Sequence, residues 1–303
     1  MRKLFLVLGI GIASIAQAHD PPDLLLLAVQ FPDTNVPVID GFDDDWSAIP
    51  VDQYGIFAET TYPVGASTRE GRALEFASQG EIDPSDMNFR HLIGWSDSQN
   101  MFYVTTSVYD NLHVTNRQDP GRFYWDDSYE MGLNADHTNI DDQNSGDIAN
   151  GFYYKYALPP KDGAFEFFRP NLNLPWLVNG TRYVEIAWSF TGEEFGESTY
   201  IYEIRILPIA QMPLSEEATE DQVVVWDFEE GQIIHWGNMV TDVDVLTGDD
   251  DYRHGQWSTS PGGTAGRPVS DVFLSPIDPG IEWGEPTTAV EAESWGRIKA
   301  QYQ

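Results

Sequence analysis

Alternation of apolar and polar side chains with a period of two residues is the feature of this sequence that most restricts its fold. Two segments, 182–190 and 199–206, follow this pattern throughout. Their apolar faces consist of Val184, Ile186, Trp188 and Phe190 in the first segment and of Tyr200, Tyr202, Ile204 and Ile206 in the second. In the second segment, Glu203 and Arg205 occupy the opposite face. A strand with one apolar side belongs to a sheet that buries one face, so the pattern predicts antiparallel β-structure.

Further segments rich in β-branched and aromatic residues extend this prediction along the chain. They are 101–109, 128–134, 151–158, 164–168, 222–228 and 272–274, separated by turn residues. Helical patterning is confined to the tail after Pro286. The expected fold is an all-β antiparallel β-sandwich of the jelly-roll type, which forms one domain over residues 19–280. Segments 55–90 and 159–181 are expected to be long loops, and 281–303 a C-terminal tail with a short helix.

The first 18 residues have the pattern of a secretory signal peptide. Arg2 and Lys3 supply positive charge, residues 4–15 are apolar, and Ala16 and Ala18 form an A-x-A cleavage site. The apolar run is shorter than a membrane-spanning helix requires. We therefore expect export to the periplasm or the cell exterior as a soluble product that is not an integral membrane protein.

Charge and composition narrow the range of partners. The 303 residues include 49 Asp and Glu against 16 Lys and Arg, which gives a formal charge of −33. Such a charge repels phosphate backbones and anionic lipids, so nucleic-acid and membrane-surface partners are not expected, whereas Ca²⁺ is favoured. With 41% hydrophobic and 13% aromatic residues, the chain can still form a large core. It contains no cysteine, which excludes disulfides and a lipid-modified cysteine.

The sequence contains none of the common catalytic motifs. It has no G-x-S-x-G, no H-E-x-x-H and no P-loop. Its six histidines are scattered at positions 19, 91, 113, 137, 235 and 254, with no pair at metal-ligand spacing. Carboxylates are too numerous for any two to be identified as a glycosidase acid and nucleophile. We therefore expect a non-catalytic protein, at most an accessory to glycoside hydrolysis, while an enzyme with an unfamiliar pattern stays open.

Three segments and their order along the chain say more about function than the search for catalytic motifs. Val38–Trp46 reads V-I-D-G-F-D-D-D-W, Gly94–Asp110 begins G-W-S-D and continues into the strand M-F-Y-V, and Tyr124–Asn134 reads Y-W-D-D-S-Y-E-M-G-L-N. In this order they resemble the family 9 carbohydrate-binding modules and their relatives, over about residues 36–275. The resemblance implies a β-sandwich that binds sugars, often at chain ends, partly through the faces of tryptophan rings.

The resemblance also implies site residues for a saccharide or polysaccharide ligand. Trp125 matches the tryptophan before the D-D-S strand, and Glu130 matches the glutamate within that strand. Trp257 matches a tryptophan of the closing region, and Tyr153 lies near a polar ligand contact of the family. Aromatic rings pack on the apolar face of a sugar, and carboxylates accept hydrogen bonds from its hydroxyls. The family's second clamping tryptophan is missing, because residues 258–266 contain no aromatic side chain.

The same residues also have purely structural interpretations. Trp125 and Trp257 can be packing residues, and Glu130 can be an ordinary solvent-facing side chain. Five other tryptophans are expected in the core: Trp46, Trp95, Trp188, Trp226 and Trp236. The Asp clusters at 43–45, 126–127, 141–142 and 249–251 are typical of solvated turns. Their oxygens could also hold a structural Ca²⁺, for which the candidates are Asp40, Asp43 and Asp127.

Two further functions stay open at this point. The sandwich could lack a sugar site and act as a structural or adhesion protein, as the missing second tryptophan suggests. A relative of this sandwich binds haem through Met and His, so a b-type electron-transfer domain is the other alternative. Its ligands would be a histidine and one of Met87, Met101, Met131 or Met239. Neither the identity of the sugar nor the oligomeric state follows from these patterns.

Overall fold

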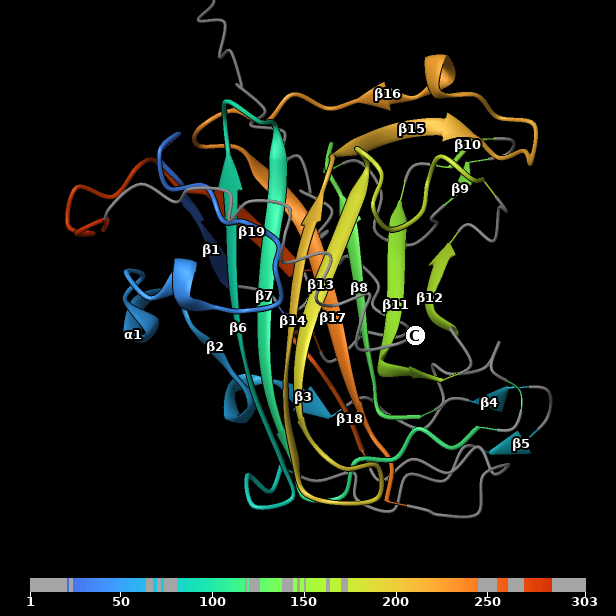
Figure 1. The fold of residues 1–303 in the computed structure, drawn as a ribbon. Helices are drawn as coiled ribbons and strands as arrows, with labels where there is room; N and C mark the ends of the chain where they lie inside the picture. The colour runs from blue at the N-terminus through green and yellow to red at the C-terminus, as the bar shows by residue number, and fades with distance from the viewer. Residues whose placement is uncertain are drawn as a thin grey trace, which may run out of the picture.

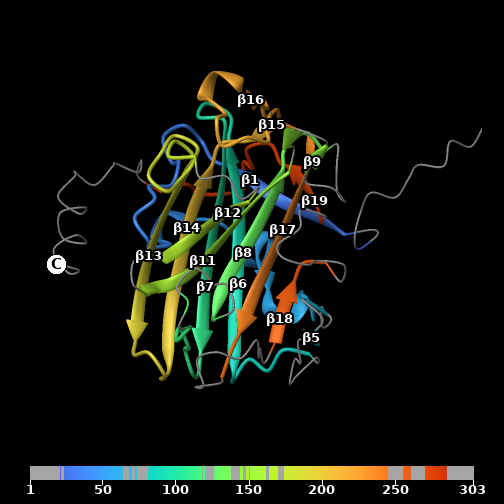
Figure 2. The same ribbon diagram turned by 90° about the vertical axis from the view of Figure 1, so that its right-hand side faces the viewer.

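The computed structural model describes residues 24–63, 81–117, 126–137, 151–161, 174–244 and 270–284, with the shorter pieces 21, 68–69, 72–73, 119, 144–145, 148–149, 164–169 and 255–260. Nearly all regular structure in these residues is β-strand, which confirms the all-β prediction. The strands form a sandwich of two large sheets (Figure 1 and Figure 2).

Antiparallel pairing connects the neighbouring strands within each large sheet. The first sheet has the order β12 (Ala164–Arg169), β11 (Phe152–Lys161), β8 (Ser128–Asn134), β17 (Ile233–Asp242) and β19 (Ser270–Leu274). β18 (Gly255–Ser258) pairs with the end of β17. The second sheet has the order β6 (Met87–Ser96), β7 (Met101–Asp110), β14 (Ser198–Ile206) and β13 (Val184–Gly192).

β1 (Leu25–Gln30) joins the two sheets and corrects the prediction of a purely antiparallel sandwich. Its first part pairs in parallel with β19, so that Leu26 lies opposite Val272. Its last two residues pair in parallel with β6, so that Val29 lies opposite Gly94. The strand thus leaves one sheet and enters the other, which closes one edge of the sandwich. Exposed sheet edges are thereby reduced, since β1 supplies partners to both.

Short elements surround the two sheets. A small sheet of β9 (Asn144–Ser145), β10 (Ile148–Ala149), β15 (Ile209–Pro213) and β16 (Val224–Val225) lies across the upper end in Figure 1. The remaining elements are β2 (Ile56–Phe57), β3 (Tyr62–Pro63), β4 (Thr68–Arg69), β5 (Arg72–Ala73), α1 (Val51–Tyr54) and single 3-10 turns at Asp44–Trp46, Ala58–Thr60 and Glu220–Gln222.

Aromatic side chains from both sheets fill the space between them. The ring of Tyr129 on β8 lies 5.2 Å from that of Tyr202 on β14. His91 on β6 is buried beside them, with Nδ1 2.8 Å from the hydroxyl of Thr106 and Nε2 2.6 Å from the side-chain nitrogen of Asn238 on β17. Burial lowers the pKa of His91 to about 3. His91 is therefore a neutral link between the sheets, with no ring nitrogen left for a haem iron.

The segment Val38–Trp46 is held against the second sheet by one buried carboxylate. Glu203 on β14 accepts hydrogen bonds from the backbone N–H groups of Asp40 (2.9 Å) and Gly41 (3.0 Å) and from the indole N–H of Trp46 (3.1 Å). Gly41 has φ +90°, and a Cβ there would lie 2.4 Å from the backbone of Trp188. The glycine and the tryptophan of this motif are thus explained by packing on β13 and β14.

Most strand predictions agree with the structure, and the exceptions have physical reasons. β8 has the predicted bounds 128–134, whereas in 222–228 only Val224–Val225 is a strand. This strand pairs with β15 at the edge of the small sheet and is exposed. Trp226 is 36% exposed, so the core prediction for Trp226 is wrong. Trp46, Trp95 and Trp236 are buried as predicted, and Trp188 is half-buried against the core.

The two predicted long loops contain regular structure. Segment 55–90 includes β2 to β5 and the beginning of β6, and 159–181 includes β12. Side chains of β17 and of the second half of β6 are buried without alternation, which removes the period-two signal there. A strand that is buried on both faces resembles any apolar run, so these two strands were difficult to delimit from sequence.

Of the two predicted domain boundaries, at residues 18 and 280, only the second lies within the described residues. The predicted signal peptide at 1–18 and the predicted helix after Pro286 lie outside them. Ile281 belongs to a buried cluster around Trp46, and the ring of Trp283 lies 5.7 Å from that of Phe31. Packing therefore continues beyond the predicted boundary at residue 280. In the part of the chain that is described, no helix is long and apolar enough to cross a membrane.

Candidate functional site

Glu130 and Tyr153, two of the predicted sugar contacts, share the outer face of the first sheet. Glu130 on β8 and Lys155 on β11 are cross-strand partners, and Lys155 Nζ lies 2.9 Å from Glu130 Oε1. Their side chains are only 2% and 7% exposed. Tyr153 is 1% exposed, with the Lys155 ammonium 5.6 Å from its ring centre. Glu130 is thus on the face predicted for it but is a buried, ion-paired group instead of a solvent-facing one.

Of the two predicted tryptophans, only Trp257 is among the described residues, and it lies on the opposite face of the sheet from Glu130. Trp125 lies outside the described residues. Trp257 on β18 lies opposite Val240, whose other neighbour is the inward-facing Tyr129, so Trp257 points into the sandwich. It is 3% exposed and belongs to the core cluster. The structure therefore favours the packing interpretation of Trp257, because a ring in the core cannot stack on a sugar.

Asp127 lies in a cluster of acidic residues at one end of the sandwich, which we call the acidic end. It consists of Asp86, Asp110, His113, Asp127, Asp242 and Asp244, where β6 and β8 begin and β7 and β17 end. Asp127 accepts hydrogen bonds from the backbone N–H groups of Val114 and Val243, the latter at 2.6 Å. Burial, together with the nearby carboxylates of Asp110 and Asp242, raises the pKa of Asp127 well above its ordinary value.

Two groups of three potential metal ligands occur within the acidic end. In the first, His113 Nδ1 lies 3.5 Å from Asp110 Oδ2 and 3.6 Å from Asp127 Oδ2. The second group contains only carboxylates, and the ligand atoms of Asp86, Asp242 and Asp244 lie within 4.8 Å of one another. In this second group, Asp242 is 1% exposed and its Oδ2 has no hydrogen-bond partner among the described residues.

The other two predicted metal candidates lie elsewhere and do not join a group of ligands. Asp40 accepts a hydrogen bond from the backbone N–H of Phe42, within its own turn. Asp43 pairs with Arg90 at 3.3 Å and accepts a hydrogen bond from the hydroxyl of Ser107 at 3.1 Å. Neither belongs to a cluster of three possible ligands among the described residues. The prediction that the Asp turns are simply solvated fails for Asp126 and Asp127, which are 1% and 0% exposed.

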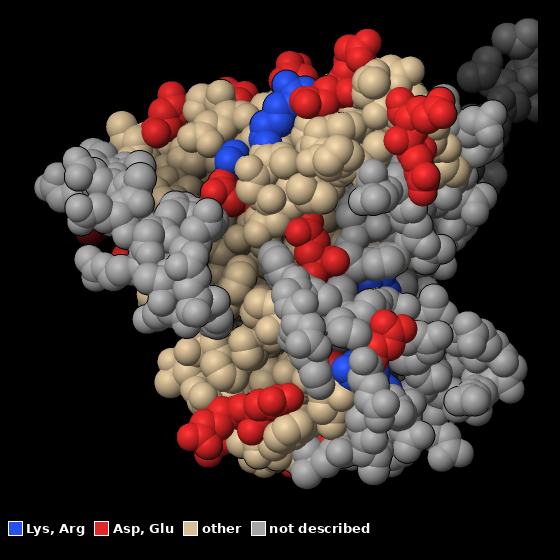
Figure 3. Space-filling model, turned by 45° about the vertical axis from the view of Figure 1, so that its right-hand side comes forward, with Lys and Arg blue, Asp and Glu red and all other residues tan. Residues whose placement is uncertain are grey.

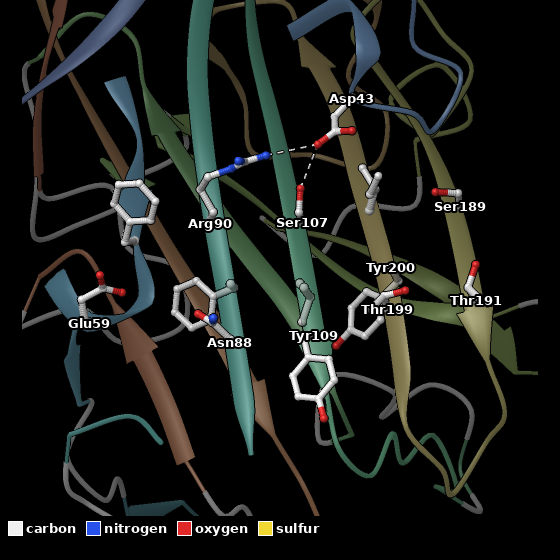
Figure 4. A pocket seen from close by; sticks show the side chains of 14 residues that line it. Asp43, Glu59, Asn88, Arg90, Ser107, Tyr109, Ser189, Thr191, Thr199 and Tyr200 are labelled. Carbon is white, nitrogen blue, oxygen red and sulfur yellow. Dashed lines mark hydrogen bonds and ion pairs between the residues drawn. The ribbon is translucent and has the colours of Figure 1, made fainter. Parts of the chain in front are cut away.

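An open groove of about 670 Å³ lies on the outer face of the second sheet (Figure 4). Its floor is formed by the outward side chains of four adjacent strands: Asn88 and Arg90 on β6, Ser107 and Tyr109 on β7, Thr199 and Ile201 on β14, and Ser189 and Thr191 on β13. Asp43 lies at one end and Glu59 at the β6 side, and Phe57 on β2 is the cross-strand partner of Arg90. The volume is within the range typical of small-ligand sites.

The polar side chains of this groove differ from those of the first sheet in being available to a ligand. Within the described chain, those of Asn88, Tyr109, Thr191 and Thr199 make no hydrogen bond to the protein. Arg90 is held in place by Asp43, as the dashed line in Figure 4 shows. Sequence reasoning missed this site, although the polar residues at alternate positions of 199–206 and 101–109 indicated which face they occupy.

Acidic side chains are distributed over the described surface in several separate groups. In the view of Figure 3 they lie along the top, near the middle and at the lower left of the visible face, and Lys and Arg are few. This distribution agrees with the formal charge of −33, which disfavours polyanionic partners.

Comparisons with known proteins give matches only at the level of structure. No protein-family model matches the sequence, and no curated protein matches it either. A family 9 carbohydrate-binding module from Caldicellulosiruptor kristjanssonii in complex with glucose is 16% identical, with 86% of this chain and 100% of that chain covered and a TM-score of 0.49. A module of the same family and organism in complex with cellotriose is 16% identical, with 88% and 100% covered and a TM-score of 0.49.

A proposed carbohydrate-binding protein from Bacteroides uniformis is also similar. It is 14% identical, with 82% of this chain and 97% of that chain covered and a TM-score of 0.44. At these identities and TM-scores the likeness carries no argument about function. The function must therefore be argued from the residues of this chain.

Proposed function

We propose that this protein binds saccharides in the open groove on the outer face of β6, β7, β14 and β13. The observation that carries the proposal is the combination, on one floor, of the half-buried ring of Tyr109 with hydroxyl and amide groups that make no hydrogen bond within the described residues. The ring of Tyr109 offers an apolar face to a sugar, while Asn88 and Thr199 can exchange hydrogen bonds with its hydroxyls. Four neighbouring strands hold these groups in fixed positions. The proposed role is binding and not catalysis.

Arg90 and Asp43 add charge-assisted hydrogen bonds at one end of the groove. Their pair is 33% exposed on each side, so both side chains retain contact with solvent and with a bound ligand. A guanidinium donates and a carboxylate accepts, so the pair can serve two neighbouring hydroxyls of one sugar ring. This arrangement favours a neutral saccharide over an anionic one, because Asp43 and Glu59 contribute two negative charges against one positive charge.

The test is the affinity of Tyr109→Ala for the saccharide that the wild-type protein binds best on a glycan array. We expect an affinity loss of about tenfold or more, as truncation of an aromatic anchor produces. The melting temperature should change little, since Tyr109 is only half-buried at the surface. Trp226→Ala is the matched control, because it removes an exposed ring outside the groove.

Trp125→Ala distinguishes this groove from the other face of the sandwich. The site at Trp125, Glu130 and Tyr153 stays a prediction, since Trp125 lies outside the described residues. If Trp125→Ala abolishes binding and Tyr109→Ala does not, the groove is the wrong location but the saccharide function stands. A protein that binds no glycan at all would instead support the structural or adhesion alternative.

We further propose that Asp86, Asp242 and Asp244 bind a structural Ca²⁺. Ca²⁺ prefers oxygen ligands, and this group offers three carboxylates from the start of β6 and the end of β17. An ion here would compensate the buried Asp242, whose pKa is raised by burial and by the charge of Asp244. Chelation should lower the melting temperature of the wild-type protein but not that of Asp242→Asn. An unchanged wild-type melting curve would contradict the proposal.

Export is part of the same proposal. The predicted signal peptide at 1–18 would deliver the protein to the periplasm or the cell exterior, where polysaccharides occur. N-terminal sequencing of the exported protein should return His19. Recovery of a chain that begins at Met1 would contradict this part of the proposal and leave saccharide binding untouched.

A further inference from the structure

His137, His235 and Asp271 converge on the outer face of the first sheet. His235 on β17 and Asp271 on β19 are direct cross-strand partners. On its other side, His235 pairs with Asn134, the last residue of β8, and His137 lies in the turn that follows. Three adjacent elements of the sheet therefore bring together side chains that are far apart in the sequence.

The distances within this group resemble those between the ligands of a tetrahedral metal ion. The Nε2 atoms of His137 and His235 lie 3.2 Å and 3.3 Å from the same oxygen, Oδ1 of Asp271. All three ligand atoms lie within 4.8 Å of one another. A tetrahedral Zn²⁺ with bonds of about 2.1 Å separates its ligand atoms by about 3.4 Å. Two of the three separations thus already have the length that this geometry requires.

The two imidazole rings also lie close together. Their ring centres are 3.9 Å apart, with planes at 36°. Both rings present a nitrogen to the same carboxylate oxygen. Imidazole nitrogens and a carboxylate oxygen that converge in this way form a donor set that one metal ion can share.

We propose that His137, His235 and Asp271 bind Zn²⁺ or a transition-metal ion of similar preference. Two imidazoles and a carboxylate select such ions over Ca²⁺ and Mg²⁺, which prefer oxygen ligands. This site is separate from the saccharide groove and from the acidic end, and it does not depend on either proposal. The ion would link the turn that follows β8 with the two strands β17 and β19.

Exposure of the three side chains supports an entry route for the ion. His137 is 30% exposed at its side chain, whereas His235 and Asp271 are 1% and 9% exposed. An ion can therefore approach from solvent on the His137 side and meet two fixed ligands on the sheet. The fourth ligand would be a water molecule or another protein group, as in sites with three protein ligands.

The test is a calorimetric titration of the tag-free, metal-depleted protein with Zn²⁺. We expect one ion per chain, and a loss of affinity of about tenfold or more in His137→Ala and in Asp271→Asn. His137→Ala is the first variant to use, because His137 is the most exposed of the three side chains and its loss should disturb folding least. Substitution with Co²⁺ should give the intense visible absorption of tetrahedral coordination, and this absorption should be lost in the same variants.

Two variants serve as controls for this titration. Asp242→Asn removes a ligand of the proposed Ca²⁺ site, and Glu59→Gln removes an exposed carboxylate outside the group. Both should bind Zn²⁺ as the wild-type protein does. Absence of stoichiometric Zn²⁺ binding, or binding that is unchanged in both His137→Ala and Asp271→Asn, would overturn the proposal.

Discussion

On both outer faces of this sandwich, polar side chains alternate along the strands with side chains that point into the core. The two faces differ in whether these polar side chains are buried and paired or exposed to solvent. On the first sheet, Glu130 and Lys155 are buried and paired with each other. On the second sheet, Asn88 and Thr199 are exposed and make no hydrogen bond to the protein within the described residues. A buried charge must be compensated by a partner, whereas an exposed hydroxyl or amide is hydrated and can exchange water for a ligand.

Substitutions on the two faces should therefore change different quantities. Glu130 and Lys155 on the first sheet stabilise the fold, so their substitution should lower the free energy of unfolding. Groups in the groove of the second sheet contribute little to stability, so their substitution should mainly lower the affinity for a ligand. The following three predictions test this contrast, beginning with the largest expected effect.

Lys155→Met should destabilise the protein by about 3–5 kcal/mol, because it leaves the carboxylate of Glu130 buried without its partner. The free energy of unfolding from urea titration is the measurement. The double variant Glu130→Leu with Lys155→Met should recover most of the loss, since no charge then remains buried at this position. A single-variant loss below 1 kcal/mol would show that this face is more hydrated than the structure indicates.

Glu203 gives the second test, because it lies on the outer face of the second sheet where Val38–Trp46 covers it. Burial raises the pKa of Glu203 to about 8 from its ordinary value of 4.5. The folded protein therefore holds a proton that the unfolded chain releases between these values, so this group's contribution to stability is lost as the pH rises from 4.5 to about 8.

Glu203→Gln removes this titration. The stability of the wild-type protein should therefore fall relative to that of Glu203→Gln as the pH rises, by at most about 1.4 kcal/mol per pH unit. Comparing the two proteins also cancels the contribution of Glu166, whose pKa is raised to about 7 by burial. Glu59→Gln, which changes an exposed carboxylate, is the control. Parallel pH profiles for all three proteins would contradict the prediction.

Arg90→Gln should have the smallest effect on stability, less than about 1 kcal/mol. Its ion pair with Asp43 is one-third exposed, and such pairs contribute little to folding. Thermal melting measures this effect, and affinity for the array-selected saccharide should fall in the same variant. A stability loss comparable with that of Lys155→Met would show that the groove is a structural surface, and the contrast between the two faces would fail.

The sequence predicts which side of a sheet a side chain occupies much better than it predicts how far that side chain is exposed to solvent. Tyr202 and Ile204 point into the core and Glu203 points outward, as the alternation of 199–206 indicates. However, Glu203 and Glu130 are buried on those outward faces, because other parts of the chain cover them. Strand periodicity reports only which side of a sheet a residue occupies. What lies over that side depends on long-range packing that no local pattern encodes.

The candidate sites were difficult to find for the same reason. His137 and His235 show no ligand spacing in the sequence, and they meet only because β8 and β17 are neighbours in the sheet. Asp86 and Asp242 lie at the start of β6 and the end of β17, which belong to different sheets, so the packing of the two sheets brings them together. Motif spacing detects ligands that share one element, whereas these groups are assembled by strand order and by sheet packing. The order of residues in 128–134 placed Glu130 on the face opposite Tyr129 and Met131 but gave no information on its pairing with Lys155.

The position of β1 has a consequence for the response of the molecule to mechanical force. β1 runs parallel to β19, so the chain before Leu25 and the chain after Leu274 leave this pair at opposite ends. Tension between these two points would slide the strands along each other and load all of their hydrogen bonds at once, instead of opening them one by one. The continuation of β1 into β6 would transmit the same load to the second sheet. A molecule pulled between these two points should therefore need a high force to unfold, because the strands must shear apart.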